Sequence, residues 1–141
     1  MDSQTKERQF SRVLFSSASD DWATPAAVYD GLNAEFHFVD DPCPLKGTEN
    51  GLLREWQSPC FVNPPYSDIY PWMEKASLEA AAGKTIVLLV PARTCTRWWH
   101  DFALKASEIR FIRGRLKFGT ATTGAPFPSC IVVFRGTEVR K

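Results

Sequence analysis

The chain has 141 residues, of which 44% are hydrophobic and 23% are charged. This length suits one domain with a real core, and the composition is that of a globular protein rather than a disordered one. Lysine and arginine number 17 against 16 acidic residues, a formal net charge of +1, so any affinity for nucleic acid must come from local patches.

Residues 1–21 are polar and rich in serine, and we expect them to form a flexible arm ahead of a single domain over 22–141. Thr24 followed by Pro25 is typical of a helix start, with a threonine cap and a proline in the first helical position. Apolar residues then recur at helical spacing, at Val28, Leu32 and Phe36. A helix of about three turns is therefore predicted.

The next apolar segment, 36–39, predicts a strand that delivers the carboxylates of Asp40 and Asp41 to its carboxyl end. From 44 to 58 no periodic element stands out, and a loop is expected there. The apolar run 60–62 then indicates another strand.

A second helix is predicted after that strand, with Asp68 as its cap and Gly83 as its stop. Its apolar face consists of Ile69, Met73, Ala76 and Ala80. Residues 85–90 are typical of a strand buried on both faces, closed by Pro91.

Thr94 or Thr96 caps a third predicted helix, which carries Trp98, Trp99, Phe102 and Ala106. Trp98 and Trp99 are interpreted as core residues. The remaining strand-like segments are 109–112, 116–118 and 129–134.

Strands that alternate with helices predict an α/β sandwich with a mostly parallel sheet. A loop rather than a helical pattern joins the last two strands. We therefore expect 129–134 to run antiparallel, as a hairpin-like partner of 109–112.

The motif Asn63-Pro64-Pro65-Tyr66 is expected at the carboxyl end of a strand, where open α/β sheets bind ligands. Its prolines stiffen the loop, because each fixes its own φ and restricts the residue before it. The Asn63 side-chain oxygen and the Pro64 carbonyl can then act as two neighbouring acceptors beside the Tyr66 ring. An exocyclic amine such as adenine N6 offers two matching N–H donors. The alternative interpretation is an ordinary surface turn.

The four cysteines, Cys43, Cys60, Cys95 and Cys130, show neither CxxC nor other zinc spacing, so reduced thiols and no metal are expected. No apolar leader and no run near the ~20 apolar residues of a membrane span is found. A cytoplasmic protein without a membrane partner is the resulting expectation.

Seven short motifs follow one another in a distinctive order: Trp22-Ala23-Thr24-Pro25, Asp40-Asp41-Pro42-Cys43, Gly51-Leu52, Asn63-Pro64-Pro65-Tyr66-Ser67, Pro91-Ala92-Arg93-Thr94, Gly114-Arg115-Leu116-Lys117-Phe118 and Ala125-Pro126-Phe127-Pro128-Ser129. This order resembles that of the small phage-type DNA N6-adenine methyltransferases, the Dam-like group. The resemblance runs from about Trp22 to Phe134. Asn-Pro-Pro-Tyr alone is shared with other methyltransferases.

The resemblance implies S-adenosylmethionine as methyl donor, adenine in DNA as acceptor, and a Rossmann-like methyltransferase fold. It also implies base flipping onto Tyr66, since the amine of a paired adenine lies inside the stack. A phage setting inside a bacterial host, with protection from restriction, is the context it suggests. The catalytic loop would be Asn63, Pro64, Pro65 and Tyr66. The donor site would be formed by Thr24, Pro25, Asp40, Asp41, Pro42, Cys43 and Asn63.

The donor side departs from larger methyltransferases, which carry a glycine-rich turn where Pro44-Leu45-Lys46 stands here. Fewer than twenty residues separate Asp41 from Cys60, whereas one βαβ unit needs about 30. Two donor-side strand-helix units are therefore predicted to be missing or vestigial, which leaves a minimal sandwich. Either the ribose contact comes from a loop residue or donor affinity is weak. The candidate loop residues are Glu49, Asn50 and Glu55.

Contacts with DNA are expected from Tyr66, Ser67, Arg93, Arg97, Arg113, Arg115 and Lys117. The last three belong, with Arg110, to a basic cluster around a glycine turn, for which a solvated sheet edge is the alternative. No separate recognition domain is visible, so sequence choice would come from loops such as 117–128 or be lax.

Three rival functions remain open at this stage: methylation of cytosine N4, methylation of a protein glutamine, and DNA binding by a remnant without a donor pocket. The oligomeric state is not indicated by the sequence.

Overall fold

The computed structural model describes residues 22–45 and 50–136, and the predicted arm over 1–21 lies outside them. The elements in chain order are α1 (Ala26–Phe36), the 3₁₀ helix η2 (Gly51–Leu53), β1 (Cys60–Val62), α2 (Tyr70–Ala81), β2 (Ile86–Pro91), α3 (Arg97–Asp101), the 3₁₀ helix η3 (Ala103–Lys105), β3 (Glu108–Phe111) and β4 (Ser129–Phe134).

Four strands form one sheet in the order β1-β2-β4-β3. Strands β1 and β2 are parallel, whereas β4 is antiparallel to both of its neighbours. Three strands therefore share one direction and β4 opposes them. The predicted antiparallel last strand and its pairing with the preceding strand are confirmed. Because β4 inserts between β2 and β3, however, only one of the three hydrogen-bonded pairs is parallel.

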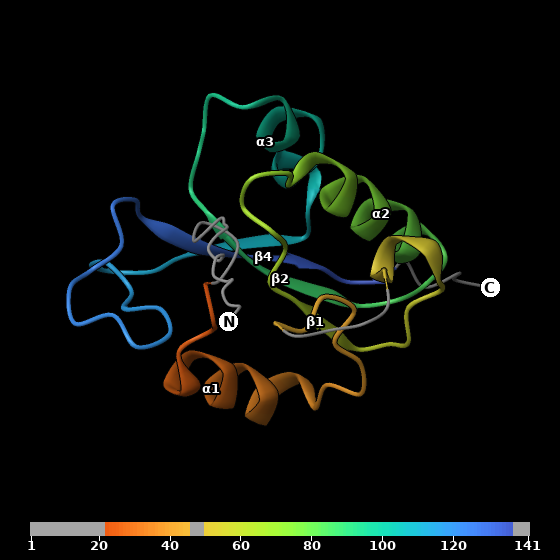
Figure 1. The fold of residues 1–141 in the computed structure, drawn as a ribbon. Coiled ribbons are helices and arrows are strands. Elements are labelled where there is room, and N and C mark those ends of the chain that lie inside the picture. Colours follow the sequence, from red (N-terminus) through yellow and green to blue (C-terminus); the bar gives the residue numbers. More distant parts are fainter. Residues whose placement is uncertain (1–21, 46–49, 137–141) are drawn as a thin grey trace, which may run out of the picture.

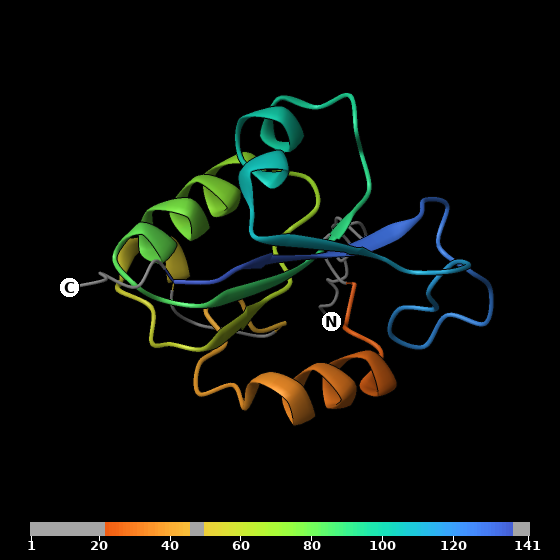
Figure 2. The same ribbon diagram turned by 180° about the vertical axis from the view of Figure 1, so that it is seen from behind.

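The molecule has three layers. Helix α1 covers one side of the sheet and α2 and α3 cover the other, as the views from front and back show (Figures 1 and 2). Every residue of β1, β2 and β4 is buried. The long segment 112–128 extends beyond the end of the sheet in both views.

The predicted strand over 36–39 is wrong. Helix α1 continues to Phe36, and His37 ends it with a left-handed φ of 58°. The Asn33 side chain then accepts a hydrogen bond from the Phe38 backbone N–H at 2.9 Å. Only a single parallel bridge remains, between Asp40 and Cys60.

Both predicted helix caps before α1 and α2 also differ from the structure. Pro25 occupies the N-cap of α1 without a side-chain cap, because the Thr24 hydroxyl is engaged elsewhere. Ile69, not Asp68, occupies the N-cap of α2, with a proline in the first turn. The stop of α2 is confirmed, since Gly83 has a φ of 101°.

The third helix is shorter than predicted. Thr96 is its cap and accepts from the Trp99 N–H, and the helix ends at Asp101. Trp98 and Trp99 are buried, as expected of core residues. The segment 116–118 is not a strand.

Candidate active site

The Asn-Pro-Pro-Tyr loop leaves the carboxyl end of β1 and precedes α2, as predicted. Pro64 is buried and Pro65 is half-buried, and the Pro65 carbonyl accepts from the Asp68 N–H at 3.1 Å. The loop is thus a packed corner of the molecule rather than an exposed turn.

The amide nitrogen of Asn63 is hydrogen-bonded, whereas its amide oxygen has no partner in the described residues. Its Nδ2 donates to the Trp22 carbonyl at 2.6 Å and to the Thr24 hydroxyl at 3.1 Å. Since a backbone carbonyl can only accept, the amide orientation follows from chemistry. Its Oδ1 is buried and has no hydrogen-bond partner within the described part of the chain. A buried acceptor of this kind is rare and calls for a donor from outside.

Tyr66 is 4% exposed, and its hydroxyl donates to the Leu89 carbonyl at 3.3 Å. Burial raises the pKa of its phenol, which therefore stays protonated. The Trp22 ring stacks on the Tyr66 ring, with centroids 6.3 Å apart and planes inclined by 18°. Tyr66 is therefore covered in this structure and presents no open face to a base.

A cavity of about 520 Å³ opens beside Asn63. Several predicted donor-site residues line it: Thr24, Asp41, Cys43 and Asn63, with Pro64 and Pro65 of the catalytic loop. Its volume lies in the range of small-molecule sites. Pro25, Asp40 and Pro42, also predicted for the donor site, are not among its lining residues.

Helix α1 supplies a wall that the sequence reasoning missed. Ala26, Tyr29 and Asp30 are spaced i, i+3 and i+4, so they share one helix face, and all three line the cavity. The Tyr29 ring packs edge-on against Phe61, with centroids 5.3 Å apart. Helical spacing could have placed these residues on one face, but nothing in the sequence says that this face meets a cavity.

The two adjacent aspartates have separate roles. Arg54 binds both carboxylate oxygens of Asp40, at 2.8 and 2.9 Å. Burial opposes the ionisation of Asp40, but Arg54 and the Gln57 N–H outweigh it and lower its pKa. Asp41 faces the cavity, and its partial burial raises its pKa. Asp40 thus fixes the chain and leaves Asp41 for a ligand.

Gly51 packs closely against the turn that follows Asp41. A Cβ at Gly51 would lie 2.0 Å from the Pro42 carbonyl oxygen, so only glycine fits. The Gly51 carbonyl in turn accepts from the buried Trp56 indole at 2.8 Å.

Of the candidate ribose ligands, neither Asn50 nor Glu55 is among the described residues that line the cavity. Asn50 caps η2 by accepting from the Leu52 N–H, and Glu55 pairs with Lys84 at 3.0 Å. Glu49 lies outside the described residues.

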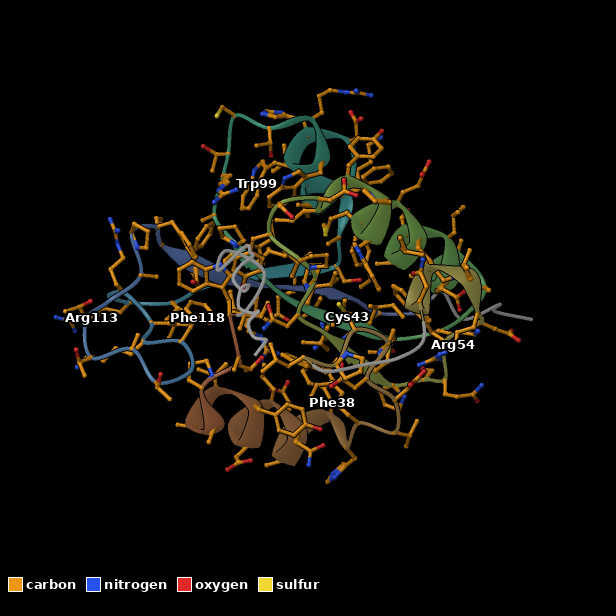
Figure 3. All side chains as sticks on the ribbon, viewed as in Figure 1. Phe38, Cys43, Arg54, Trp99, Arg113 and Phe118 are labelled. Carbon is orange, nitrogen blue, oxygen red and sulfur yellow. The ribbon has the colours of Figure 1, made fainter. Side chains whose placement is uncertain are left out.

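Apart from the buried Tyr66, the predicted DNA contacts lie on exposed surface. Ser67, Arg93, Arg97, Arg113, Arg115 and Lys117 are all exposed. Figure 3 places Arg113 at the outer edge of the 112–128 segment and Phe118 further in. Arg110 differs, because its guanidinium binds Glu35 and Glu108, each at 2.7 Å. For Arg110 the alternative of a structural edge residue is therefore the better one.

Comparison with known proteins decides the family. The family model described as DNA N-6-adenine-methyltransferase (Dam) matches residues 12–135. The chain belongs to this family. It is also 31% identical over 123 residues to a DNA N-6-adenine-methyltransferase of Haemophilus phage HP1, an alignment that covers 77% of this chain and 71% of the phage protein. No solved structure matches it significantly.

The chain is therefore an enzyme, and DNA adenine N6 methylation is the reaction of its family. The predicted resemblance to phage-type enzymes is confirmed. Among residues 22–45 and 50–136 no group of histidine, cysteine or carboxylate side chains could hold a metal ion. No helix in the same ranges is long and apolar enough to cross a membrane.

Proposed function

We propose that the cavity binds S-adenosylmethionine and that Asn63 presents the N6 amine of a flipped DNA adenine to it. The observation that carries this proposal is the buried Asn63 Oδ1, which faces no partner in the described residues while the other end of the amide is fixed. The reaction of the family supports adenine N6 as the methyl acceptor. The position of the loop at the carboxyl end of β1 supports this loop as the place where the adenine binds.

The charge of the cavity fits a donor with net positive charge. The charged side chains among its described lining residues are Asp30 and Asp41, both carboxylates. Tyr29 and Phe61 add aromatic surface. We assign Asp30 and Asp41 to polar or cationic groups of the donor. In this way α1 replaces part of what the missing strand-helix units hold in larger enzymes.

Methyl transfer needs orientation more than proton chemistry. The donor supplies a methyl group on a positively charged sulfur. Asn63 Oδ1 and the Pro64 carbonyl would accept the two N–H bonds of adenine N6, which favours a tetrahedral nitrogen with its lone pair aimed at the methyl group. An amide does not take up a proton at neutral pH. Asn63 would therefore polarise the amine. The carbon–nitrogen bond would form as the methyl–sulfur bond breaks and the electron pair of that bond stays on sulfur, so that S-adenosylhomocysteine leaves, and the nitrogen would then lose its proton to water.

Exposed cationic side chains in two segments of the chain suit phosphate contacts. Arg93 and Arg97 follow β2, and Arg113, Arg115 and Lys117 lie on the 112–128 segment. Contacts of this kind position the duplex, whereas base contacts select a sequence. We assign sequence choice to the 112–128 segment, since no separate recognition domain is present in the described residues.

The test is incubation of the protein with labelled S-adenosylmethionine and unmethylated DNA, followed by digestion to nucleosides. We expect label in N6-methyldeoxyadenosine. Label in N4-methyldeoxycytidine, or in protein glutamine when protein is offered, would support the rival acceptors instead. A folded protein that binds DNA but transfers no label would favour the non-catalytic alternative.

A further inference from the structure

The indole of Trp22 fills an aromatic box. Besides its stacking on Tyr66, its ring meets Phe118 and Phe127 edge-on, each with centroids 5.3 Å apart. Tyr66, Phe118 and Phe127 also contact one another, at centroid distances of 5.6 to 6.0 Å. These three rings are the walls of the box, and Trp22 enters it from a different part of the chain.

The indole of Trp22 does not satisfy its own hydrogen-bonding group inside the box. Its Nε1 is buried and finds no hydrogen-bond partner in the described residues. Asn63 Oδ1, on a residue bonded to the Trp22 backbone, is buried and unpartnered within the same ranges. A native core seldom leaves such groups unpaired, and those that exist tend to mark a site for a ligand, a water molecule or an ion. The indole thus fills the apolar space of the box, while its own Nε1 and Asn63 Oδ1 stay without a partner in the described residues.

The backbone at Trp22 is fixed independently of its ring. Its carbonyl accepts from Asn63, and the Ala23 carbonyl accepts from the Gly119 N–H at 3.0 Å. The side chain also lines the cavity beside Asn63, so the ring separates that cavity from Tyr66. Rotation of the indole would join the two spaces without breaking either backbone hydrogen bond.

We propose that the Trp22 indole is an internal occupant of the acceptor-base site, held in the box formed by Tyr66, Phe118 and Phe127 until a purine displaces it. Indole and purine are both fused five- and six-membered aromatic rings. A 6-aminopurine would also bring N–H donors toward Asn63 Oδ1, which the indole does not satisfy. The inference rests on the proposed function in one respect, namely that the natural purine is an adenine from DNA.

The experiment uses 9-methyladenine as the probe, with binding measured by titration calorimetry or ligand-observed NMR. Trp22→Ala empties the box, and we expect this variant to bind 9-methyladenine at least tenfold more tightly than the unmodified protein does. With 9-methylpurine, which lacks the amino group, the gain should be several-fold smaller. Adding Phe118→Ala removes one wall and should abolish most of the gain.

A second measurement covers the case in which Trp22→Ala does not fold. The protein has five tryptophans, and labelling with 5-fluorotryptophan gives each a ¹⁹F signal, with that of Trp22 assigned from Trp22→Phe. Saturating 9-methyladenine should shift the Trp22 signal and leave those of Trp56 and Trp72 in place.

The proposal is overturned if folded Trp22→Ala gains no affinity for 9-methyladenine, if Phe118→Ala leaves the gain intact, or if the Trp22 signal stays fixed at saturation. The labelling of DNA is measured separately. If the protein methylates adenine in DNA but Trp22→Ala gains no affinity for 9-methyladenine, only the proposed role of the aromatic box is rejected. If Trp22→Ala gains affinity for 9-methyladenine but the protein transfers no methyl group to DNA, the purine site is supported and the proposed reaction is rejected.

Discussion

The proposed role of Asn63 as an acceptor depends on the different surroundings of the two ends of its amide. Trp22 and Thr24 hold the Nδ2 end, so the buried Oδ1 keeps one direction. An acceptor that is already oriented needs no reorganisation when the amine arrives, which is how fixed dipoles favour a transition state.

Asn63→Ala is expected to lower the single-turnover rate of methyl transfer by about a hundredfold or more, the usual cost of removing one preorganised polar group. Donor affinity, measured by calorimetry, should change by no more than about twofold, since the variant leaves Asp30 and Asp41 in place. Equal losses of donor binding and rate would contradict this division of labour.

Asp30 offers a test of the wall that α1 contributes. Replacing it with asparagine keeps the shape and removes the charge, and we expect donor affinity to fall about fivefold, near the upper limit for an exposed charge pair. Glu74, an exposed carboxylate of α2 that does not line the cavity, provides the control. If Glu74→Gln weakens donor binding as much as Asp30→Asn does, the effect comes from overall charge and not from the cavity.

The residues of the site were predictable to different degrees. Asn63 lines the cavity because it follows β1, a strand that its apolar sequence predicts. Asp41 and Cys43 also line it, although only a single bridge, between Asp40 and Cys60, remains of the strand predicted before them. The resemblance implies Asp40 for the donor site as well, but Arg54, distant in sequence, binds its carboxylate. Asp30 could not be found, since a helix face becomes a cavity wall only through tertiary packing.

At the scale of elements, the antiparallel orientation of β4 could be inferred because a loop and not a crossover helix precedes it. The end of α1 could not be inferred in the same way. Phe36 suits a strand as well as a helix, and the outcome depends on Asn33. Its backbone carbonyl accepts from the His37 N–H and its side chain accepts from the Phe38 N–H, the first two beyond the helix end.

In the short connection between Asp41 and Cys60, Gly51 packs against Pro42 on the proposed donor side of the cavity. Gly51→Ala should lower the free energy of unfolding by about 1–3 kcal/mol, as overpacked core positions do, and should also weaken donor binding, because the new methyl group displaces Pro42 next to Asp41. Thermal unfolding and calorimetry measure the two effects.

Gly31→Ala is the matched control for this change. Gly31 lies inside α1, and a Cβ added there would have no atom within 4 Å beyond its own helix and chain neighbours, so alanine should raise stability by about 0.5–1 kcal/mol. If Gly51→Ala proved as stable as the unmodified protein, the close approach of Gly51 and Pro42 would not hold in solution.

For the whole molecule, a formal charge of +1 hides an uneven distribution. Arg113 and Arg115 lie exposed on the projecting 112–128 segment, whereas Arg110 and Arg135 are engaged with Glu108. Arg113 and Arg115, unlike Arg110 and Arg135, are therefore the candidates for phosphate contact in this region.

Neutralising Arg113 and Arg115 together, each to glutamine, should weaken DNA binding and reduce the slope of log affinity against log salt by about 2, given roughly 0.9 per phosphate contact. Arg110→Gln is the control, and it should lower stability while leaving the slope unchanged, because Glu35 and Glu108 already occupy that guanidinium. An unchanged slope in the double variant would mean that this segment does not touch phosphate.

The contact between Asn63 and the adenine amine can be measured directly with a double-mutant cycle on an oligonucleotide that the enzyme methylates. Affinity is determined for that oligonucleotide and for one in which purine, lacking the 6-amino group, replaces the target adenine, each with the unmodified protein and with Asn63→Ala. We predict a coupling energy of about 1 kcal/mol or more, the size of a buried hydrogen bond. A coupling energy of zero in folded proteins that bind both oligonucleotides would contradict the central claim.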